Sequence, residues 1–444
     1  MTSQPVAVIG AGLAGSEAAL VLARAGIPVE LFEQRPHHST PAHTTDLPAE
    51  LVCSNSLKSM QLPSAHALLK KELGILESPL LREARAVRVP AGSALAVDRT
   101  AFARRVLECL AREERITLIR RECARAPEGY ACCIVAAGPL VSDALAGWLM
   151  TTFSSNALHF YDAIAPIIAA DSVDMSVAFF ANRREREGTD YLNCPFSETE
   201  FRRFHRALVD ADRVAARAFE NARFFEACLP VEVVAQRGPD ALAFGTLKPV
   251  GLTDPRTGRR PYAVCQLRRE NAPGESLGMV GFQTRLTQKA QREVFRLIPG
   301  LAHAEFLRYG SIHRNTYLDG PDLLTAGLSF AAHPAVFLAG QLCGNEGYTE
   351  SIATGHLAAL SAAARMRGGT FEPPPPTTAC GALLRHVTAS REKPFTPSNI
   401  NFGLIDPLGA GGKRIGKHDK RRLLCERAVR DLTAWRRSSV RDTT

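Results

Sequence analysis

Short runs of apolar residues alternate with a helical segment at the start of the chain. Residues 6–9 form the first run, and residues 27–32 form a second run that ends at Glu33. Between them, residues 16–25 are rich in helix formers, and Gly26 stops that helix. Predominantly apolar runs of this length are typical of strands buried on both faces of a parallel sheet. The order strand, helix, strand therefore predicts one complete βαβ unit.

The pattern changes twice further along the chain. After the first unit comes a loop-rich segment at 34–65, followed by predicted helices near 68–73 and over 97–112 and a buried strand at 131–136. The same strand and helix pattern returns near the end of the chain, with a buried strand at 335–339 and a helix at 351–365. The chain then has a basic, partly helical stretch at 413–437. From about 165 to 305, alternating segments at 264–268 and 279–283 and a helix near 198–220 predict a mixed sheet. We therefore expect an α/β fold with a discontinuous nucleotide-binding domain (1–165 and 306–444) and an inserted α+β domain (166–305).

Composition narrows the class of protein. The 444 residues are 45% hydrophobic and 22% charged, as in ordinary globular proteins. No apolar run reaches membrane-spanning length and no leader pattern precedes the first strand, so we expect a cytoplasmic protein. The eleven cysteines include no CxxC pair and predict neither disulfides nor a metal site. A formal charge of +9 favours a polyanionic partner, although an arginine-rich surface alone would give the same value.

The turn after the first strand carries a nucleotide-binding pattern. Gly10 permits a tight turn, Gly12 lets a pyrophosphate approach the backbone, and Gly15 lets the helix pack against the strand. Ala11, Leu13 and Ala14 complete the turn. Glu33, at the end of the second strand, is placed to accept hydrogen bonds from ribose hydroxyls. The complete order predicts dinucleotide binding and disfavours an S-adenosylmethionine site.

Two later segments favour FAD over NAD. Residues 336–341 followed by a helix resemble the second flavin segment of glutathione-reductase-like flavoproteins, with Gly340-Gln341 where that class has Gly-Asp. Residues 134–139 resemble the Ala-Thr-Gly element of the same class, with Ala137 in place of Thr. We therefore predict a glutathione-reductase-like, FAD-binding Rossmann domain.

Two cysteines stand apart from the other nine. Cys53 lies among polar residues in a loop soon after the second strand, where it can fold back over a flavin. Cys228 lies between apolar residues in the inserted segment and, taken alone, is typical of a buried structural residue.

Blocks spread over nearly the whole chain resemble the TrmFO family, the folate- and FAD-dependent tRNA (uracil-C5-)methyltransferases. These blocks are residues 8–19, 40–43, 50–57, 88–92, 94–99, 191–195, 248–252, 308–310, 313–316, 346–348 and 399–403. Ala137, Cys343 and Asn345 depart from the family pattern and affect details of flavin contact.

The resemblance implies methylation of C5 of a T-loop uridine, position 54, in tRNA. The carbon would come from methylenetetrahydrofolate and the electrons from FAD reduced by NADH or NADPH. Uracil C5 becomes nucleophilic when a thiolate adds at C6, and a second group must remove the C5 proton. The family's functional cysteines match Cys53 and Cys228. Cys228 is the favoured nucleophile and Cys53 the group that handles the proton, and the reverse assignment stays open.

The resemblance also indicates supporting residues. His313, Arg314 and Tyr348 lie near the returning flavin segment and are candidates for contact with flavin, folate or base, although such residues are often structural. Lys248, Arg268 and the tail from Lys413 are candidates for tRNA phosphates, or a solvated basic face. The chain does not indicate which residues bind folate.

Other functions remain compatible with the sequence. The fold alone suits a flavin oxidoreductase acting on a small molecule. An RNA-binding protein with a structural FAD and a methyltransferase of ribosomal RNA are further alternatives.

Overall fold

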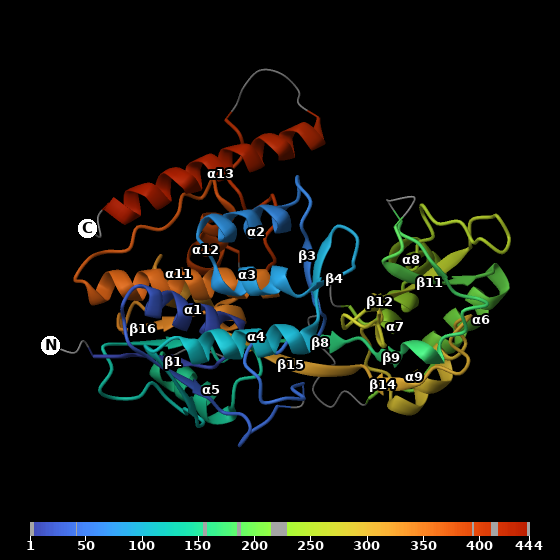
Figure 1. Cartoon of the computed structure of the whole chain (residues 1–444), viewed down its shortest axis with the longest axis horizontal. Helices are drawn as coiled ribbons and strands as arrows, with labels where there is room; N and C mark the ends of the chain where they lie inside the picture. The colour runs from blue at the N-terminus through green and yellow to red at the C-terminus, as the bar shows by residue number, and fades with distance from the viewer. Residues whose placement is uncertain are drawn as a thin grey trace.

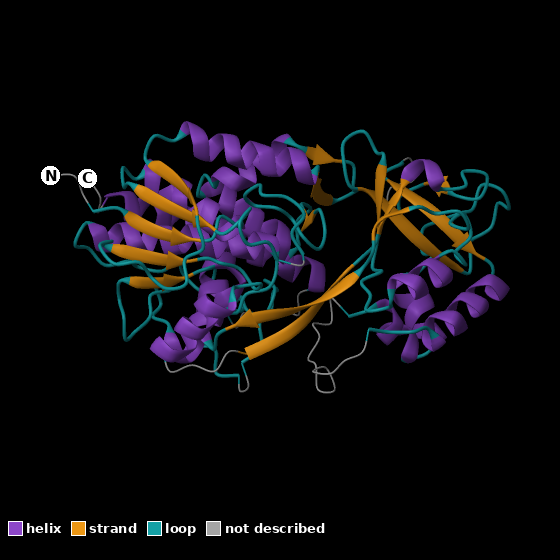
Figure 2. Ribbon diagram, turned by 90° about the horizontal axis from the view of Figure 1, so that it is seen from below, coloured by secondary structure: helices purple, strands orange, loops and turns teal. Residues whose placement is uncertain are grey.

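The computed structural model describes residues 4–40, 42–153, 158–183, 188–214, 229–392, 395–409 and 416–441, without the side chains of 158–162, 312–314 and 439–441. Two predicted site residues, Cys228 and Lys413, lie outside the described residues. The described chain forms two bodies joined by a two-stranded ribbon (Figures 1 and 2).

The larger body is built on a parallel sheet with the strand order β16-β7-β1-β2-β6. Its strands are β1 (Val6–Ile9), β2 (Val29–Glu33), β6 (Ile116–Arg120), β7 (Cys132–Val135) and β16 (Val336–Leu338). β1, β7 and most of β2 are buried, as the apolar runs predict. β16 comes from the far end of the chain and extends the sheet beside β7, so the nucleotide-binding body is discontinuous in sequence.

Helices pack against this sheet, and their buried side chains form a hydrophobic core together with those of the strands. They are α1 (Leu13–Arg24), α2 (Ala65–Ile75), α3 (Pro79–Ala86), α4 (Arg99–Arg112), α5 (Asp143–Thr152), α10 (Gly320–Leu323), the 3₁₀ turn η4 (Gly340–Cys343), α11 (Tyr348–Met366) and α12 (Ala379–Ala389). α1 and α11 pack so closely that a Cβ on Gly355 would lie 2.2 Å from the Ala14 carbonyl oxygen. Glycine at position 355 is therefore needed for this contact. Asp98 caps α4 through the amide of Ala101, as predicted from the sequence.

The ribbon pairs β8 (Leu158–Ile164) with β15 (Ser311–Tyr317) in antiparallel fashion. It leads to a six-stranded sheet of order β10-β11-β12-β13-β9-β14. The described strands of this sheet all pair in antiparallel fashion, so the predicted mixed sheet is wrong. These strands are β9 (Ile167–Ala169), β10 (Phe179–Phe180), β11 (Tyr191–Phe196), β12 (Ala263–Arg269), β13 (Ser276–Met279) and β14 (Phe306–Arg308). The helices of this body are the 3₁₀ turn η1 (Ala170–Ser172), α6 (Glu198–Asp210), α7 (Val231–Gln236), α8 (Pro239–Ala241), the π-helical η3 (Leu242–Thr246) and α9 (Gln288–Phe295).

Each body has its own hydrophobic core. The core of the smaller body runs from Ile168 to Ala304 and includes a cluster of aromatic rings around Phe204 and Phe282. The core of the larger body uses residues up to Phe153 and again from Leu318. The division of the chain into independently folding domains at 166–305 stays a prediction.

Several local expectations differ from the structure. The segment 34–65 is not all loop, because β3 (Ser56–Ser59) pairs with β5 (Ala94–Val97), which also pairs with β4 (Arg88–Val89). The predicted strand at 279–283 ends at Met279, because Gly281 has a φ of +78°. The helix near 198–220 ends at Asp210, and residues 215–220 lie outside the described part.

The basic tail forms the long helix α13 (Lys417–Arg441), which lies across α2 (Figure 1). Arg436 anchors it through the Ile75 carbonyl and an ion pair of 2.9 Å with Glu77. None of the helices in the described part of the chain combines the length and apolar character needed to cross a bilayer.

Candidate functional site

The glycine turn between β1 and α1 has the tight geometry that its sequence predicts. Gly10 has a φ of +100°, and a Cβ there would lie 2.6 Å from the Ala136 carbonyl oxygen. A Cβ on Gly15 would lie 1.8 Å from the Gly10 carbonyl oxygen. Gly12 differs, because a Cβ there would meet no described atom within 4 Å. The first and third glycines are therefore required by packing, whereas the second faces open space.

The amino terminus of α1 opens into this space. Gly12 is the N-cap, and no side chain caps the helix. Amide groups and the positive end of the helix dipole therefore face a pocket that is also lined by Leu13 and Ala14. Such a terminus binds phosphate groups without a side-chain cation. Ala11 is buried beneath the turn, and its amide donates to Glu33.

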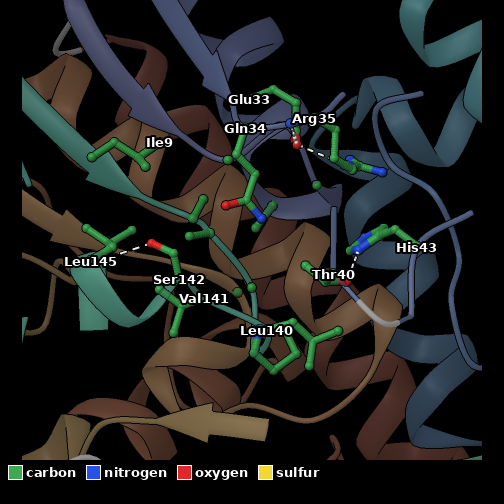
Figure 3. Close-up of a pocket in the computed structure, with 18 of the residues that line it drawn as sticks. Ile9, Glu33, Gln34, Arg35, Thr40, His43, Leu140, Val141, Ser142 and Leu145 are labelled. Carbon is green, nitrogen blue, oxygen red and sulfur yellow. Dashed lines mark hydrogen bonds and ion pairs between the residues drawn. The ribbon is translucent and has the colours of Figure 1, made fainter. Parts of the chain in front are cut away.

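A buried ion-pair network closes one side of the pocket (Figure 3). Glu33 Oε1 accepts from Arg35 Nε at 2.8 Å, and its Oε2 accepts from the Ala11 amide at 3.1 Å. Burial would raise the pKa of Glu33, but the bonds and charge of Arg35 outweigh it and lower the pKa. Arg35 also reaches Glu50 at 3.2 Å. The carboxylate is therefore ionised and fixed at the pocket wall.

The second flavin-like segment completes the pocket from the opposite end of the chain. Gly340 has a φ of +74°, and a Cβ there would lie 3.1 Å from the Ala14 Cβ. Gln341, Ala137 and Ser351 also line the pocket. The two segments predicted from separate parts of the sequence thus meet across α1.

Cys343, one departure from the family pattern, is a structural residue. It is buried, and its thiol donates to the Gly340 carbonyl at 3.0 Å. Burial raises the pKa of this thiol to about 12, so it stays protonated. Asn345 accepts from the hydroxyl of Thr354, which in turn accepts from the Gly340 amide. Both residues support the backbone of the second segment.

Cys53 and Tyr348 are in direct contact at the edge of the pocket. The Tyr348 hydroxyl lies 3.0 Å from Cys53 Sγ, 2.9 Å from the Cys53 amide nitrogen and 3.2 Å from the Ser54 amide nitrogen. The two amides donate to the hydroxyl oxygen and use its acceptor capacity. The hydroxyl proton is then left for the sulfur, so Tyr348 donates to Cys53 Sγ.

The loop that carries Cys53 is tied to the smaller body. Arg99 donates to the Leu51 carbonyl at 2.7 Å and forms an ion pair of 2.7 Å with Glu270. Arg268 of β12 donates to Asn55 at 2.8 Å and to Ser54 at 3.1 Å. Arg268 is therefore engaged with the loop, and its role as a phosphate contact stays a prediction.

A second cavity opens on the other side of Cys53. Its lining joins the Cys53 loop and Arg99 to strands β9 and β13 of the smaller body, including Ile167 and Met279. Cys53 lines this cavity and Tyr348 lines the dinucleotide pocket, so their hydrogen bond crosses the wall between the two spaces. This thiol is only partly buried, as its polar neighbours predict.

The sequence did not indicate the roles of several residues near this wall. His43 lies 2.6 Å from the Thr40 hydroxyl, and burial, followed by the charge of Arg35, lowers its pKa to about 4 (Figure 3). Arg308 of β14 donates to the Ala42 carbonyl at 3.1 Å. Residues 40–43 and 308–310 belong to the sequence blocks that resemble the TrmFO family. Membership in these blocks was the sequence feature that could have indicated a role for His43 and Arg308.

The other predicted site residues are partly described. His313 and Arg314 lie on β15, opposite Asp162 and Tyr161 of β8, and their side chains are outside the description. Lys248 is exposed and lines a separate cavity between the two bodies. The structure therefore joins Gly10, Gly12, Glu33, Gly340 and Tyr348 in one pocket, and it gives no position for Cys228.

The strand order, the glycine turn and the returning segment define a Rossmann-type dinucleotide-binding protein with a second body inserted after the first half of the fold. Residues 5–370 match the family model described as glucose inhibited division protein A. GidA of Aquifex aeolicus has a similar fold in two crystal forms, with TM-scores of 0.70 and 0.68 and sequence identities of 16% and 14%. These alignments cover 97% of this chain and 74% and 76% of the GidA chains, and they confirm the predicted fold class.

Curated relatives align over nearly the whole chain. The methylenetetrahydrofolate–tRNA-(uracil-5-)-methyltransferase TrmFO of Geotalea daltonii is 48% identical over 98% of this chain and 99% of its own length. TrmFO of Anaeromyxobacter sp. Fw109-5 is 50% identical over 98% and 97%, and TrmFO of Solibacter usitatus is 49% identical over 99% and 100%. The chain belongs to the TrmFO family, and the resemblance stated from its sequence blocks is confirmed.

Proposed function

We propose that this protein methylates C5 of a T-loop uridine in tRNA, at position 54, with methylenetetrahydrofolate as carbon donor and NAD(P)H as source of electrons. Family membership supports the reaction class. The observation that carries the proposal within this structure is the hydrogen bond from Tyr348 to Cys53, which places a thiol at the wall between the dinucleotide pocket and a second cavity.

The residues of the pocket fit FAD. The α1 amino terminus at Gly12 would hold the pyrophosphate, and Glu33 would accept from a ribose hydroxyl. Gly340 and Gln341 would hold the returning part of the cofactor, and an ordinary side chain at Gly340 would be strained. When bound, FAD supplies the redox chemistry that converts a methylene group to a methyl group.

Cys53 is suited to accept the C5 proton. A sulfur that accepts a hydrogen bond from Tyr348 is favoured in its thiolate form, which is the form that acts as a base. Arg99 lies close enough to interact electrostatically with Cys53, and its pairing with Glu270 outweighs burial and raises its own pKa. The guanidinium therefore stays charged beside the sulfur. Cys228 would then be the nucleophile at C6, as the family resemblance implies.

A direct test is transfer of label from folate to RNA. Purified holoenzyme, NADPH and [methylene-¹⁴C]tetrahydrofolate should label an unmodified tRNA transcript at uridine 54, and a transcript with cytidine at that position should stay unlabelled. Cys53→Ala and Cys228→Ala should each abolish labelling while the flavin absorbance is retained. Absence of labelling with flavin-loaded wild-type protein would refute the proposal.

The same assay separates the alternatives. Labelling of ribosomal RNA instead of tRNA would identify the other RNA substrate. NADPH oxidation that continues without RNA and folate in both cysteine variants would favour a small-molecule oxidoreductase. An enzyme with tRNA and folate as substrates would act in the cytoplasm, and that location stays part of the proposal.

A further inference from the structure

The cavity that contains Lys248 lies where three segments of the chain meet. Gln61, Gly92 and Ser93 come from the larger body, Asn182, Arg183 and Tyr191 flank β10 and β11, and Lys248 and Val250 come from the turn after η3. Gln266 of β12 also lines the cavity. The lining residues include Arg183 and Lys248 as cations, and among the residues that the structure describes no carboxylate lines the cavity.

The walls of this cavity are held in place by specific contacts. The Gly92 amide donates to the Asp190 carboxylate at 2.5 Å, and the Tyr191 hydroxyl donates to the Ala91 carbonyl at 3.1 Å. Asp190 also accepts from Asn182 at 3.3 Å, so this nearby carboxylate is already engaged. Hydrogen bonds between the two bodies therefore fix the walls of this cavity.

A glycine places the turn that carries Lys248 against the backbone of Arg183. Gly251 has a φ of +80°, and a Cβ there would lie 1.9 Å from the Arg183 carbonyl oxygen. The turn from Lys248 to Gly251 therefore packs directly on the backbone of Arg183. A side chain at position 251 would clash with this backbone and displace the turn.

The guanidinium of Arg183 has an unused hydrogen-bonding edge. Its Nε and Nη2 atoms are buried and have no hydrogen-bond partner in the described part of the chain. These two N–H groups form one side of the fork that binds two oxygens of a carboxylate or phosphate. Burial lowers the pKa of Arg183, and the described groups that oppose this effect are Tyr191 and Cys265 rather than a carboxylate. Arg183 is half-buried, and leaving two buried N–H groups without acceptors is costly, which points to a missing anionic partner at this edge.

The cavity shares a strand face with the Cys53 loop. Gln266 and Arg268 are two residues apart on β12 and therefore point to the same face of the sheet. Arg268 contacts Ser54, next to Cys53, and Gln266 lines the cavity. The Cys53 loop and the cavity are therefore linked through neighbouring side chains of one strand.

We propose that Arg183 and Lys248 form an oxyanion subsite that holds an anionic group of a substrate outside the reacting centre. The inference rests on the proposed function, which supplies two sources of such a group. One is a glutamyl carboxylate of the folate, and the other is a phosphate of the RNA backbone. Arg183 binds two oxygens with its fork, and Lys248 supplies a second charge at the cavity mouth.

The test uses flavin-loaded Arg183→Gln, Arg183→Lys and Lys248→Gln, with Lys289→Gln as the control for loss of one exposed lysine charge outside the cavity. We expect Arg183→Gln to weaken binding of one substrate about tenfold or more, with kcat retained. Arg183→Lys should not restore binding, because a lysine has no fork. Flavin content and thermal unfolding show whether each variant is folded, and Lys248→Gln alters only an exposed side chain.

The two candidate anionic groups, a folate carboxylate and an RNA phosphate, predict different changes in the binding constants. A folate carboxylate predicts a higher KM for methylenetetrahydrofolate, with an unchanged Kd for tRNA. An RNA phosphate predicts a higher Kd for tRNA and a salt dependence reduced by about one phosphate contact, with an unchanged KM for folate. The inference is overturned if both constants in Arg183→Gln and Lys248→Gln equal those of Lys289→Gln.

A readout without turnover separates this inference from the proposed function. Inorganic phosphate should raise the unfolding temperature of wild-type holoenzyme more than that of Arg183→Gln. If this difference appears but wild-type enzyme transfers no methyl group, the anion site stands and the proposed function fails. If methyl transfer occurs but phosphate stabilises wild-type and variant equally and both constants are unchanged, only the anion site fails.

Discussion

At the residue scale, the hydroxyl of Tyr348 controls the hydrogen bonding of Cys53. Tyr348→Phe removes the donor to Sγ and leaves the amides of Cys53 and Ser54 without their acceptor. We expect a fall in kcat of about 10²-fold, the size typical of losing a group that assists proton transfer. Turnover of methylenetetrahydrofolate on a tRNA transcript measures this effect.

Alkylation of Cys53 gives an independent check on the same variant. Iodoacetamide should modify the Cys53 peptide more slowly in Tyr348→Phe, because the thiolate loses its hydrogen bond. Buried cysteines such as Cys133, whose pKa burial raises well above its usual value, provide unreactive internal references. Equal alkylation rates and an unchanged kcat would show that Tyr348 does not support the sulfur.

His43 makes stability depend on pH. Burial and the charge of Arg35 lower its pKa from 6.5 to about 4, so the folded protein keeps this ring neutral at pH 5. The unfolded chain binds a proton there, and stability is therefore lost as the pH falls from about 6.5 towards 4. Between pH 7 and pH 5 the loss is up to about 2 kcal/mol.

His43→Gln removes this contribution. Urea unfolding at several pH values should show a smaller loss of stability on acidification in the variant than in the wild-type protein. Parallel curves for the two proteins would contradict a neutral, buried His43.

At the scale of the element, the β1–α1 turn contains one glycine that packing requires, Gly15, and one that we expect cofactor binding to require, Gly12. Gly15→Ala places a Cβ 1.8 Å from the Gly10 carbonyl oxygen and should strongly destabilise the apoprotein. Gly12→Ala meets no described atom within 4 Å, so the apoprotein should keep its unfolding temperature. The added methyl group would instead occupy the space of the pyrophosphate. Gly12→Ala is therefore expected to fold without retaining flavin, as measured by the ratio of absorbance at 450 nm to 280 nm. Retention of flavin by Gly12→Ala would place the pyrophosphate elsewhere.

At the scale of the whole molecule, the excess positive charge should make tRNA binding sensitive to salt. Lys417 and Lys420 are exposed at the start of α13. If both contact phosphates, Lys417→Gln with Lys420→Gln should reduce the slope of log Kd against log salt by about two. Filter binding of a tRNA transcript at several salt concentrations measures the slope, and Lys289→Gln is the control. An unchanged slope would indicate that α13 lies outside the RNA interface.

The sequence by itself determined the βαβ unit, its three glycines and the cap of α4. These features depend on residues close together in the chain, where apolar periodicity and backbone freedom act directly.

Only the tertiary structure decided which distant residues meet. Cys53 and Tyr348 are 295 positions apart, and Arg268 reaches the Cys53 loop from the smaller body. The Nε–Nη2 edge of Arg183, which has no partner among the described residues, became visible only when its neighbours in space were known. Local patterns specify elements, whereas hydrogen-bond partners and burial depend on how the elements pack, and this packing places the thiol, the tyrosine and the cationic cavity.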